Sequence, residues 1–432
     1  MKRVLIISPH FPPINAADMH RIRHSLPYFR NFGWDAEVIT VKPEFVESYS
    51  IDQLLVETIP KDIPVHYVDA WEINKTRKFG LGNVGMRSFF QFRKKGNELL
   101  KKKKFDLVYF STTAFHVMAL GPYWQRRFKI PFIVDIQDPW RNDFYLDKPA
   151  SQRPKKFWFA YTIDKLLEAY TIPRADGVIS VSVSYCKTFK ERYKKLKYRE
   201  CKVIPFGGSV MDFSVMENSA IQPGIQLDKN KINLVYIGRG GHDMNFVVKH
   251  FFEAIRKLSQ GNDPTFSRIQ CWFIGTSYAL PGKGKKTIEP VAREMGLQNV
   301  TEITDRIPFF ETLKLMRTAD VLFVPGSTDA GYTASKIYPY ILAEKPLLAI
   351  FNKQSSVVDI LKETGVGEVI SFASTEDSPA LVDEITESLK RLIQTRTHHF
   401  TYNRTAFDKY SAETMTRRQS DYFDNVLNEF RS

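Results

Sequence analysis

The sequence predicts an α/β protein made of two tandem doubly wound, Rossmann-like domains, each with a parallel sheet covered by helices. Apolar runs of four to six residues alternate with longer amphipathic stretches along almost the whole chain, the pattern of parallel strands buried on both faces. The length of 432 residues suits two or three domains. Hydrophobic residues make up 43% and charged residues 25% of the chain, which excludes disorder, collagen-like repeats and a disulfide scaffold.

In the first half, each expected strand is a short apolar run. These strands cover residues 4–8, 36–40, 65–68, 107–110, 132–136, 177–181 and 201–205, with helical stretches between them. The periodicity then stops, because Gly207-Gly208, a patternless polar stretch and Pro223-Gly224 follow. We expect a linker between the two domains here, within residues 206–230.

The second half repeats the alternation. Its expected strands cover residues 232–237, 270–275, 300–304, 321–325, 347–351 and 368–371, with helices such as 245–260 and 310–319 between them. Residues 412–430 form an amphipathic pattern typical of a terminal helix. We therefore expect an N-terminal domain at 1–206, onto which a helix at about 405–432 packs back, and a C-terminal domain at 207–404.

The three cysteines are Cys186, Cys201 and Cys271, and they form neither a CxxC pair nor an even framework. They predict thiols used as small apolar residues in a reducing compartment. The apolar start is too short for a signal peptide and is expected to be a strand. No run approaches the roughly 20 apolar residues that span a bilayer, so we expect a cytoplasmic protein whose membrane contact, on the inner face of the cytoplasmic membrane, is peripheral.

The net charge of +14 is unevenly distributed. Residues 1–205 carry 36 Lys and Arg against 21 Asp and Glu, whereas residues 206–432 carry 26 against 27. The first half therefore predicts a surface that faces an anionic partner, such as a phospholipid leaflet or a lipid-linked phosphate. Solvated helix faces are the alternative for each single basic cluster.

Two glycines flank an arginine directly after the expected strand 232–237. Gly238, Arg239 and Gly240 precede a helix, and such a turn lets backbone N–H groups and a guanidinium approach a phosphate. A plain turn is the alternative, because neither GxxxxGK[ST] nor GxGxxG spacing is present.

A second phosphate-directed element follows the expected strand 321–325. A polar loop leads into Ser335 and Lys336, which open a helix. Ser335 can cap this helix and Lys336 can meet an anion at its N-terminus, although a simple cap is the alternative. Two such elements in one domain indicate a diphosphate.

In the first half, two polar loops follow strands, at residues 9–21 and 137–141. Ligands of parallel sheets bind at the carboxyl ends of the strands, so we expect both loops at a cleft between the domains. Asp138 is suited to a sugar hydroxyl, and His116 either reaches the sugar or lies on a helix face.

These residues together resemble the GT-B glycosyltransferases, specifically the retaining, glycogen-synthase-like family 4. The resemblance covers nearly the whole chain, and its motifs are VLIISPHFPP at 4–13, VDIQDPW at 134–140, GVISVS at 177–182, VIPFGG at 203–208, LVYIGRGG at 234–241 and ADVLFVPG with ASKIYPYILAEKPLLAI within 319–350. It implies transfer of a hexosyl or N-acetylhexosaminyl group from a nucleotide diphosphate sugar to a glycan or lipid-linked acceptor, in surface polysaccharide biosynthesis. No cofactor, no metal and no nucleic acid partner are expected.

The resemblance also implies roles for individual residues. Catalytic roles fall to Asp138, His116, Arg239 and Lys336. Donor binding falls to Gly238, Arg239, Gly240, Arg306, Ile307, Asp329, Tyr332, Thr333, Ser335 and Lys336, and acceptor binding to Pro13, Asn15, Arg21 and Trp140. Cations are suited to the donor site because the leaving diphosphate develops negative charge.

One departure from the family pattern leaves alternatives open. Two glutamates of the donor half would fall at about Gly331 and Pro339, and both are missing. Asp329 is a replacement for the first acid, whereas the second has none. The alternatives are a catalytically silent GT-B-like binding subunit and a basic nucleic-acid-binding protein, although the chain carries no signature of a nucleic-acid-binding module.

Overall fold

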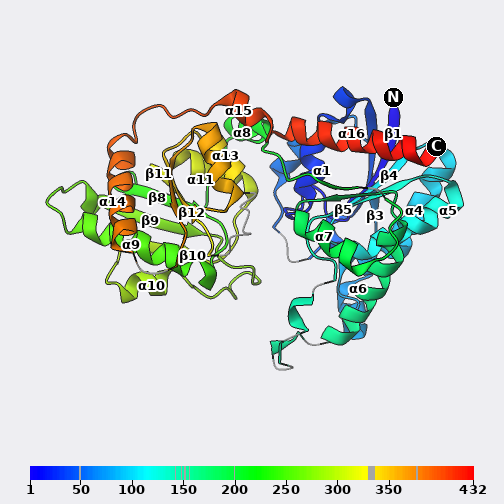
Figure 1. Ribbon diagram of the computed structural model, residues 1–432, viewed down its shortest axis with the longest axis horizontal. Coiled ribbons are helices and arrows are strands. Elements are labelled where there is room, and N and C mark those ends of the chain that lie inside the picture. Colours follow the sequence, from blue (N-terminus) through cyan, green and yellow to red (C-terminus); the bar gives the residue numbers. More distant parts are fainter. Residues whose placement is uncertain are drawn as a thin grey trace. The chain divides into compact units, whose positions relative to one another are not determined.

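The computed structural model describes the chain except residues 48, 49, 142, 147, 150, 151, 155, 199, 329–335, 376 and 377. The chain divides into two compact units. Unit 1 combines Met1–Gly207 with Ala412–Ser432, and unit 2 is Gly208–Ser411. In each unit helices cover a parallel sheet (Figure 1).

Unit 1 contains a seven-stranded sheet in its described part, in the order β3-β2-β1-β4-β5-β6-β7. The strands are β1 (Lys2–Ile7), β2 (Trp34–Val41), β3 (Val65–Val68), β4 (Leu107–Ser111), β5 (Phe132–Ile136), β6 (Gly177–Ser180) and β7 (Cys201–Val203). All pairs are parallel, and the order reverses direction between β1 and β4, which pair from Val4 with Leu107 to Ile7 with Phe110. This reversal is the topological switch point at which such sheets bind ligands.

The helices of unit 1 bury the sheet on both faces. They are α1 (Met19–Ser25), α2 (Ile73–Thr76), α3 (Val84–Arg87), α4 (Phe89–Lys102), α5 (Leu120–Phe128), α6 (Phe157–Thr171), α7 (Val183–Arg192) and α16 (Ala412–Arg431). Alternate residues of β1 enter two separate cores: Val4 and Ile6 pack in one, and Leu5 and Ile7 in the other. Both cores are fully apolar at these positions, which explains the uninterrupted apolar run in the sequence.

Helix α16 completes unit 1, lying along α1 (Figure 1). Phe423 packs against Trp34 and Tyr109, with ring centroids 5.4 and 4.9 Å away. Gln419 accepts a hydrogen bond from Ser25 at 2.6 Å. The expected terminal helix is therefore part of the unit 1 core.

Unit 2 contains a six-stranded parallel sheet in its described part, in the order β10-β9-β8-β11-β12-β13. The strands are β8 (Ile232–Ile237), β9 (Ile269–Ile274), β10 (Val300–Ile303), β11 (Val321–Pro325), β12 (Leu347–Asn352) and β13 (Glu368–Phe372). The helices are α8 (Val210–Glu217), α9 (Asn245–Ser259), α10 (Glu289–Glu294), α11 (Phe309–Thr318), α12 (Ile337–Leu342), α13 (Ser356–Thr364), α14 (Pro379–Gln394) and α15 (Arg404–Asp408). The order reverses between β8 and β11, which gives unit 2 its own switch point.

The structure corrects the expected linker and the expected start of the terminal helix. Helix α8 lies inside the stretch expected to be a linker, because Phe213 and Met216 are buried in unit 2. The chain returns to unit 1 at Ala412 rather than at about 405. The preceding α15 stays in unit 2, where Phe407 packs against Tyr338 with ring centroids 6.1 Å apart.

The expectation of three free thiols is wrong for two cysteines. Cys186 in α7 and Cys201 in β7 form a disulfide. Cys271 is free and buried in β9, and burial raises the pKa of its thiol. The pairing joins two neighbouring elements whose approach is set by the fold, so the spacing of the cysteines did not reveal it.

Candidate functional site

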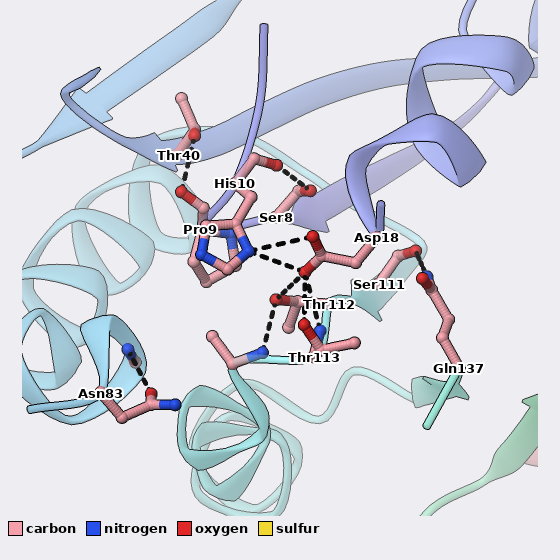
Figure 2. A network of polar contacts seen from close by, with 12 residues as sticks. Ser8, Pro9, His10, Asp18, Thr40, Asn83, Ser111, Thr112, Thr113 and Gln137 are labelled. Atoms are coloured by element: carbon pink, nitrogen blue, oxygen red, sulfur yellow. Dashed lines mark hydrogen bonds and ion pairs between the residues drawn. The ribbon is translucent and has the colours of Figure 1, made fainter. Parts of the chain in front are cut away.

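In unit 1, the loop after β1 is fixed to the end of β4 by the carboxylate of Asp18 (Figure 2). Asp18 Oδ2 accepts hydrogen bonds from Thr113 N at 2.8 Å, Thr112 Oγ1 at 3.0 Å and Thr113 Oγ1 at 3.1 Å, and lies 2.8 Å from His10 Nδ1. Burial alone raises the pKa of Asp18. The charge and hydrogen bond of His10, with the bonds from the threonines, outweigh this and lower the pKa to about 2. An ionised carboxylate thus fixes the loop at the switch point.

A second buried network lies beside the first, between β4 and β5. Arg21 Nε donates to Asp135 Oδ2 at 3.0 Å, and both side chains are fully buried. Ser111 Oγ and Gln137 Nε2 donate to the same oxygen, at 3.0 and 2.9 Å. Asp135 Oδ1 and Gln137 Oε1 are buried without a hydrogen-bond partner among the described residues. The network holds the ends of β4 and β5 together.

Arg21 and Trp140 do not fit the acceptor contacts expected of them. Besides bonding Asp135, Arg21 donates to the carbonyl oxygens of Ile204 and Pro205 at 2.6 and 2.9 Å, so its guanidinium is used inside unit 1. Trp140 is buried and stacks on Phe115 with ring centroids 5.6 Å apart. Both side chains shape the site from within rather than facing a ligand.

Pro13 and Asn15 remain half-buried at the loop after β1. Pro13 accepts a hydrogen bond from Asp52 N at 2.8 Å, and Asn15 N donates to Ser50 O at 2.9 Å. Their loop is thereby attached to residues 50–52, which gives it a defined conformation.

Asp138 follows β5 and is exposed, as a ligand contact requires. Desolvation by the surrounding protein and then the negative charge of Asp18 raise its pKa. Asp138 in turn raises the pKa of Tyr185, after desolvation of that phenol. An exposed carboxyl near the switch point is therefore available to hydrogen-bond a hydroxyl.

The contacts of His116 do not match the role expected for it. Its Nε2 lies 3.1 Å from Asp164 Oδ1 of α6, and its Nδ1 is buried without a partner among the described residues. One nitrogen is engaged and the other is shielded, so the structure gives no support to a contact between His116 and a sugar.

In unit 2, the loop after β8 is fixed to the end of β11 in the same topological position. Arg239 binds Asp243 at two points, Nη1 to Oδ1 at 3.0 Å and Nη2 to Oδ2 at 2.7 Å. Thr328 N donates to the backbone oxygen of Asp243 at 3.0 Å. The hydrogen bond from Arg239 and then one from Ser327, against desolvation, lower the pKa of Asp243 to about 2.

The two glycines beside Arg239 serve the turn itself. Gly238 N and Gly240 N donate to Ile274 O and Thr276 O at 3.0 and 2.8 Å. These amides are thus used between β8 and β9 rather than directed at a ligand. A Cβ at Gly240 would lie 2.8 Å from Thr287 Oγ1, so the backbone approaches its neighbours closely there.

Lys336 lies near two further cations. Desolvation, followed by the positive charges of Arg306 and Arg239, lowers the pKa of Lys336 to about 8, although part of its side chain remains exposed. Arg306 follows β10 and its guanidinium lies 4.3 Å from the ring centroid of exposed Tyr278. Ile307, next to it, is half-buried. Three cations thus follow strands of this sheet at their carboxyl ends, and Arg239 and Arg306 act electrostatically on Lys336.

Four expected donor contacts, Asp329, Tyr332, Thr333 and Ser335, lie outside the described residues, as does Gly331. Pro339 is half-buried in α12, between the buried rings of Tyr338 and Tyr340. The position of the second family glutamate is thus built into a packed helix.

The reasoning from sequence missed His10, Asp18, Asp135 and Asp243. The signal for Asp135 is its place inside the apolar run FIVDI, because an acid in a buried strand needs a partner. Asp243 lies four residues after Arg239, at the spacing of ion pairs on helices. His10 and Asp18 carried no such signal.

Within the described residues, no three His, Cys, Asp or Glu side chains are grouped so as to hold a metal ion. In the same part of the chain, no helix has the length and apolar character needed to cross a bilayer.

Comparison with known proteins finds likeness in structure alone. No protein-family model and no curated protein matches the sequence. The N-terminal domain of Candida albicans trehalose-6-phosphate phosphatase superposes with a TM-score of 0.56 at 14% identity, covering 99% of this chain and 97% of that one. The chain has the GT-B fold. The UDP-forming α,α-trehalose-phosphate synthase of Burkholderia xenovorans, in complex with glucose-6-phosphate, shares this fold with a TM-score of 0.52 at 12% identity and full coverage of both chains.

A third GT-B structure is described as trehalose-6-phosphate from E. coli bound with UDP-2-fluoro glucose. It has a TM-score of 0.50 at 13% identity and covers 100% of this chain and 97% of its own. At such identities the likeness establishes the GT-B fold alone.

Proposed function

We propose that this protein is a retaining glycosyltransferase. It transfers a hexosyl or N-acetylhexosaminyl group from a nucleotide diphosphate sugar to a glycan or lipid-linked acceptor in surface polysaccharide biosynthesis. The observation that carries the proposal is the placement of three cations after parallel strands of unit 2: Arg239 and Lys336 follow the switch-point strands β8 and β11, Arg306 follows β10, and both arginines act electrostatically on Lys336. The descriptions of two similar structures mention UDP: one enzyme is UDP-forming, and the other structure has UDP-2-fluoro glucose bound.

The cations suit the charge that develops in this reaction. The bond between the sugar and the diphosphate breaks, a bond to the acceptor oxygen forms, and the acceptor hydroxyl releases its proton. Negative charge thereby accumulates on the leaving diphosphate, where Lys336 and Arg306 can stabilise it. We propose that these side chains make a metal ion unnecessary. Transfer activity should therefore persist in EDTA.

The other proposed contacts follow from exposure and position. Asp138 is the exposed carboxyl of unit 1 that we assign to a sugar or acceptor hydroxyl. Exposed Tyr278, with Arg306 over its ring, is suited to the nucleobase, because bases stack on aromatic rings and guanidinium planes. For the acceptor, we propose the half-buried loop at Pro13 and Asn15.

A panel of UDP-, GDP- and other nucleotide sugars tests the proposal. We expect one donor to bind, as measured by calorimetry, and to transfer its sugar with retention at the anomeric carbon, as measured by NMR. Arg239→Ala and Lys336→Ala should each weaken donor binding at least tenfold, since charge-assisted bonds to phosphate contribute about 1.5–3 kcal/mol. Lys229→Ala, an exposed lysine outside the switch point, is the matched control. Absence of binding and transfer for the whole panel would refute the proposal.

A second candidate, a catalytically silent GT-B-like binding subunit, is favoured by the bidentate pair of Arg239 and Asp243. In this pair, two nitrogens of the Arg239 guanidinium already donate to a carboxylate of the same chain. The two glutamates of the family pattern are also missing, at about positions 331 and 339. A silent subunit would keep its cellular role in the Lys336→Ala variant, whereas an enzyme would lose it.

We also propose that the protein works as a peripheral protein at the cytoplasmic face of a membrane. The excess of basic residues in 1–205 supports this, because the anionic leaflet attracts lysine and arginine.

A further inference from the structure

An exposed apolar surface lies on unit 1, formed by the first turns of α6 and by the turn after α2. Phe79, Trp158, Phe159 and Leu166 are 73%, 56%, 48% and 64% exposed, and we call these four residues the α6 patch. Phe159 and Leu166 lie seven residues apart, so they share one face of the helix, and Trp158 precedes Phe159 directly. Large apolar side chains exposed together mark an interaction surface.

The two segments of the patch are joined into one surface. Lys156 Nζ donates to Lys78 O at 2.6 Å. A Cβ on Gly80, whose φ is +83°, would lie 2.9 Å from the ring of Phe159, so the absence of a side chain at Gly80 lets the turn and the helix approach. The patch is therefore a built feature of unit 1.

Cations surround the patch. Arg153 lies over Trp158, with its guanidinium carbon 5.1 Å from the ring centroid. Exposed basic side chains on the same two segments and at the start of α6 are Arg77, Lys78, Lys156 and Lys165. Long basic side chains beside aromatic rings are typical of surfaces that enter the interface of a bilayer.

Both carboxylates of α6 are engaged elsewhere. Asp164 pairs with His116 at 3.1 Å. Glu168 is fully buried, where it binds Arg192 at 2.9 Å and Tyr193 at 2.7 Å. The face of α6 that carries Trp158, Lys165 and Leu166 is therefore apolar and positive.

We propose that the α6 patch docks on an anionic phospholipid bilayer. The rings of Phe79, Trp158 and Phe159 enter the boundary between headgroups and acyl chains, and the surrounding lysines and arginines bind lipid phosphates. The positive charge around the patch favours a lipid bilayer over a protein partner. Anionic headgroups neutralise the five surrounding cations, whereas an apolar protein partner would leave them unpaired. This inference deepens the proposed function by placing unit 1 where a lipid-linked acceptor lies, and it does not depend on the donor.

Flotation of the full chain with lipid vesicles tests the docking. We expect binding to vesicles of phosphatidylcholine with phosphatidylglycerol, and weak binding to phosphatidylcholine alone. Trp158→Ser with Phe159→Ser should reduce binding to the anionic vesicles at least tenfold. Arg77→Ser with Lys78→Ser should reduce it about thirtyfold, since each cation near an anionic leaflet contributes about a fivefold factor.

Matched controls use exposed residues of unit 1 outside the patch. Val183→Ser removes an apolar side chain that is 69% exposed, and Lys101→Ser with Lys104→Ser removes two exposed lysines of α4 and its end. Val183→Ser should bind vesicles like the wild type. Lys101→Ser with Lys104→Ser should reduce vesicle binding less than Arg77→Ser with Lys78→Ser does. Equal losses in patch and control variants, or no vesicle binding by the wild type, overturn the proposal. Self-association that Trp158→Ser abolishes, without vesicle binding, would assign the patch to a second copy instead.

Fluorescence quenching locates the contact independently of affinity. Brominated lipids should quench the wild type more than Trp158→Phe, which keeps an apolar ring and should still bind. Equal quenching places the contact elsewhere and overturns the proposal. Donor binding without vesicles separates this proposal from the proposed function, because it should be unchanged in the patch variants and at least tenfold weaker in Lys336→Ala.

Discussion

Arg21 and Asp135 form a fully buried ion pair between the helix after β1 and the strand β5, with Nε 3.0 Å from Oδ2. The two other guanidinium nitrogens of Arg21 donate hydrogen bonds to the carbonyl oxygens of Ile204 and Pro205. The pair thus ties α1, β5 and the end of unit 1's first segment to one another.

Arg21→Ala should lower the free energy of unfolding by roughly 3–5 kcal/mol, because it leaves the buried carboxylate of Asp135 uncompensated. Urea denaturation followed by circular dichroism measures this. Arg93→Ala, at an exposed position on α4, should change stability by less than about 0.5 kcal/mol. A small effect of Arg21→Ala would show that the pair contributes little.

The carboxylate of Asp18 should make stability depend on acid pH. Its pKa falls from 3.8 to about 2 on folding, so its contribution is fully present above pH 4 and is lost as the pH falls toward 2. The shift corresponds to about 2 kcal/mol. Denaturation at a series of pH values should show this loss in the wild type and not in Asp18→Asn.

Asp421→Asn, at an exposed position of α16, controls for the general effect of removing a carboxylate. If Asp18→Asn and the wild type lose stability in parallel below pH 4, the pairing of Asp18 with His10 does not produce the shift.

Donor affinity should decrease as the pH rises through about 8, because the pKa of Lys336 in the free protein is about 8 and an anion binds the protonated amine. Calorimetry with the active nucleotide diphosphate sugar on both sides of pH 8 measures this. Lys336→Arg should keep its affinity at the higher pH, since a guanidinium stays protonated. An identical pH dependence in Lys336→Arg would assign the titration to another group.

Reduction of the disulfide Cys186–Cys201 should lower the free energy of unfolding by about 3 kcal/mol, given a sequence separation of 15. Thermal denaturation with and without a reductant measures this, and Cys186→Ser with Cys201→Ser should be insensitive to the reductant. Thiol titration of the denatured wild type, oxidised beforehand, should find one free thiol, that of Cys271. Three thiols in protein taken directly from cells would indicate a reducing compartment, and one an oxidising compartment.

The strands of both sheets could be predicted from the sequence, because each buried strand is a continuous apolar run. β8 (Ile232–Ile237) and β11 (Val321–Pro325) match their expected ranges. Helix α8 was missed because its eight residues have no clear periodicity, and their burial comes from contacts with unit 2. Burial of this kind is a property of the fold and not of a local pattern.

The candidate site could be predicted only where a residue type itself carries the chemistry. Lys336 and Arg306 are cations after strands, and Arg306 acts electrostatically on Lys336. Arg21 was expected at the acceptor because its loop follows β1, yet its partner Asp135 is 114 residues away. Contacts between the ends of different strands depend on sheet order, which the sequence does not state residue by residue.

The return of residues 412–432 to unit 1 makes unit 2 an insertion within it. During synthesis the ribosome must therefore complete residues 208–411 before Phe423 can reach Trp34 and Tyr109. We expect a released chain that ends at residue 411 to carry a protease-resistant unit 2 beside a protease-sensitive unit 1; equal resistance of the two would contradict this order. Synthesis of unit 1 therefore starts before that of unit 2 and is finished after it.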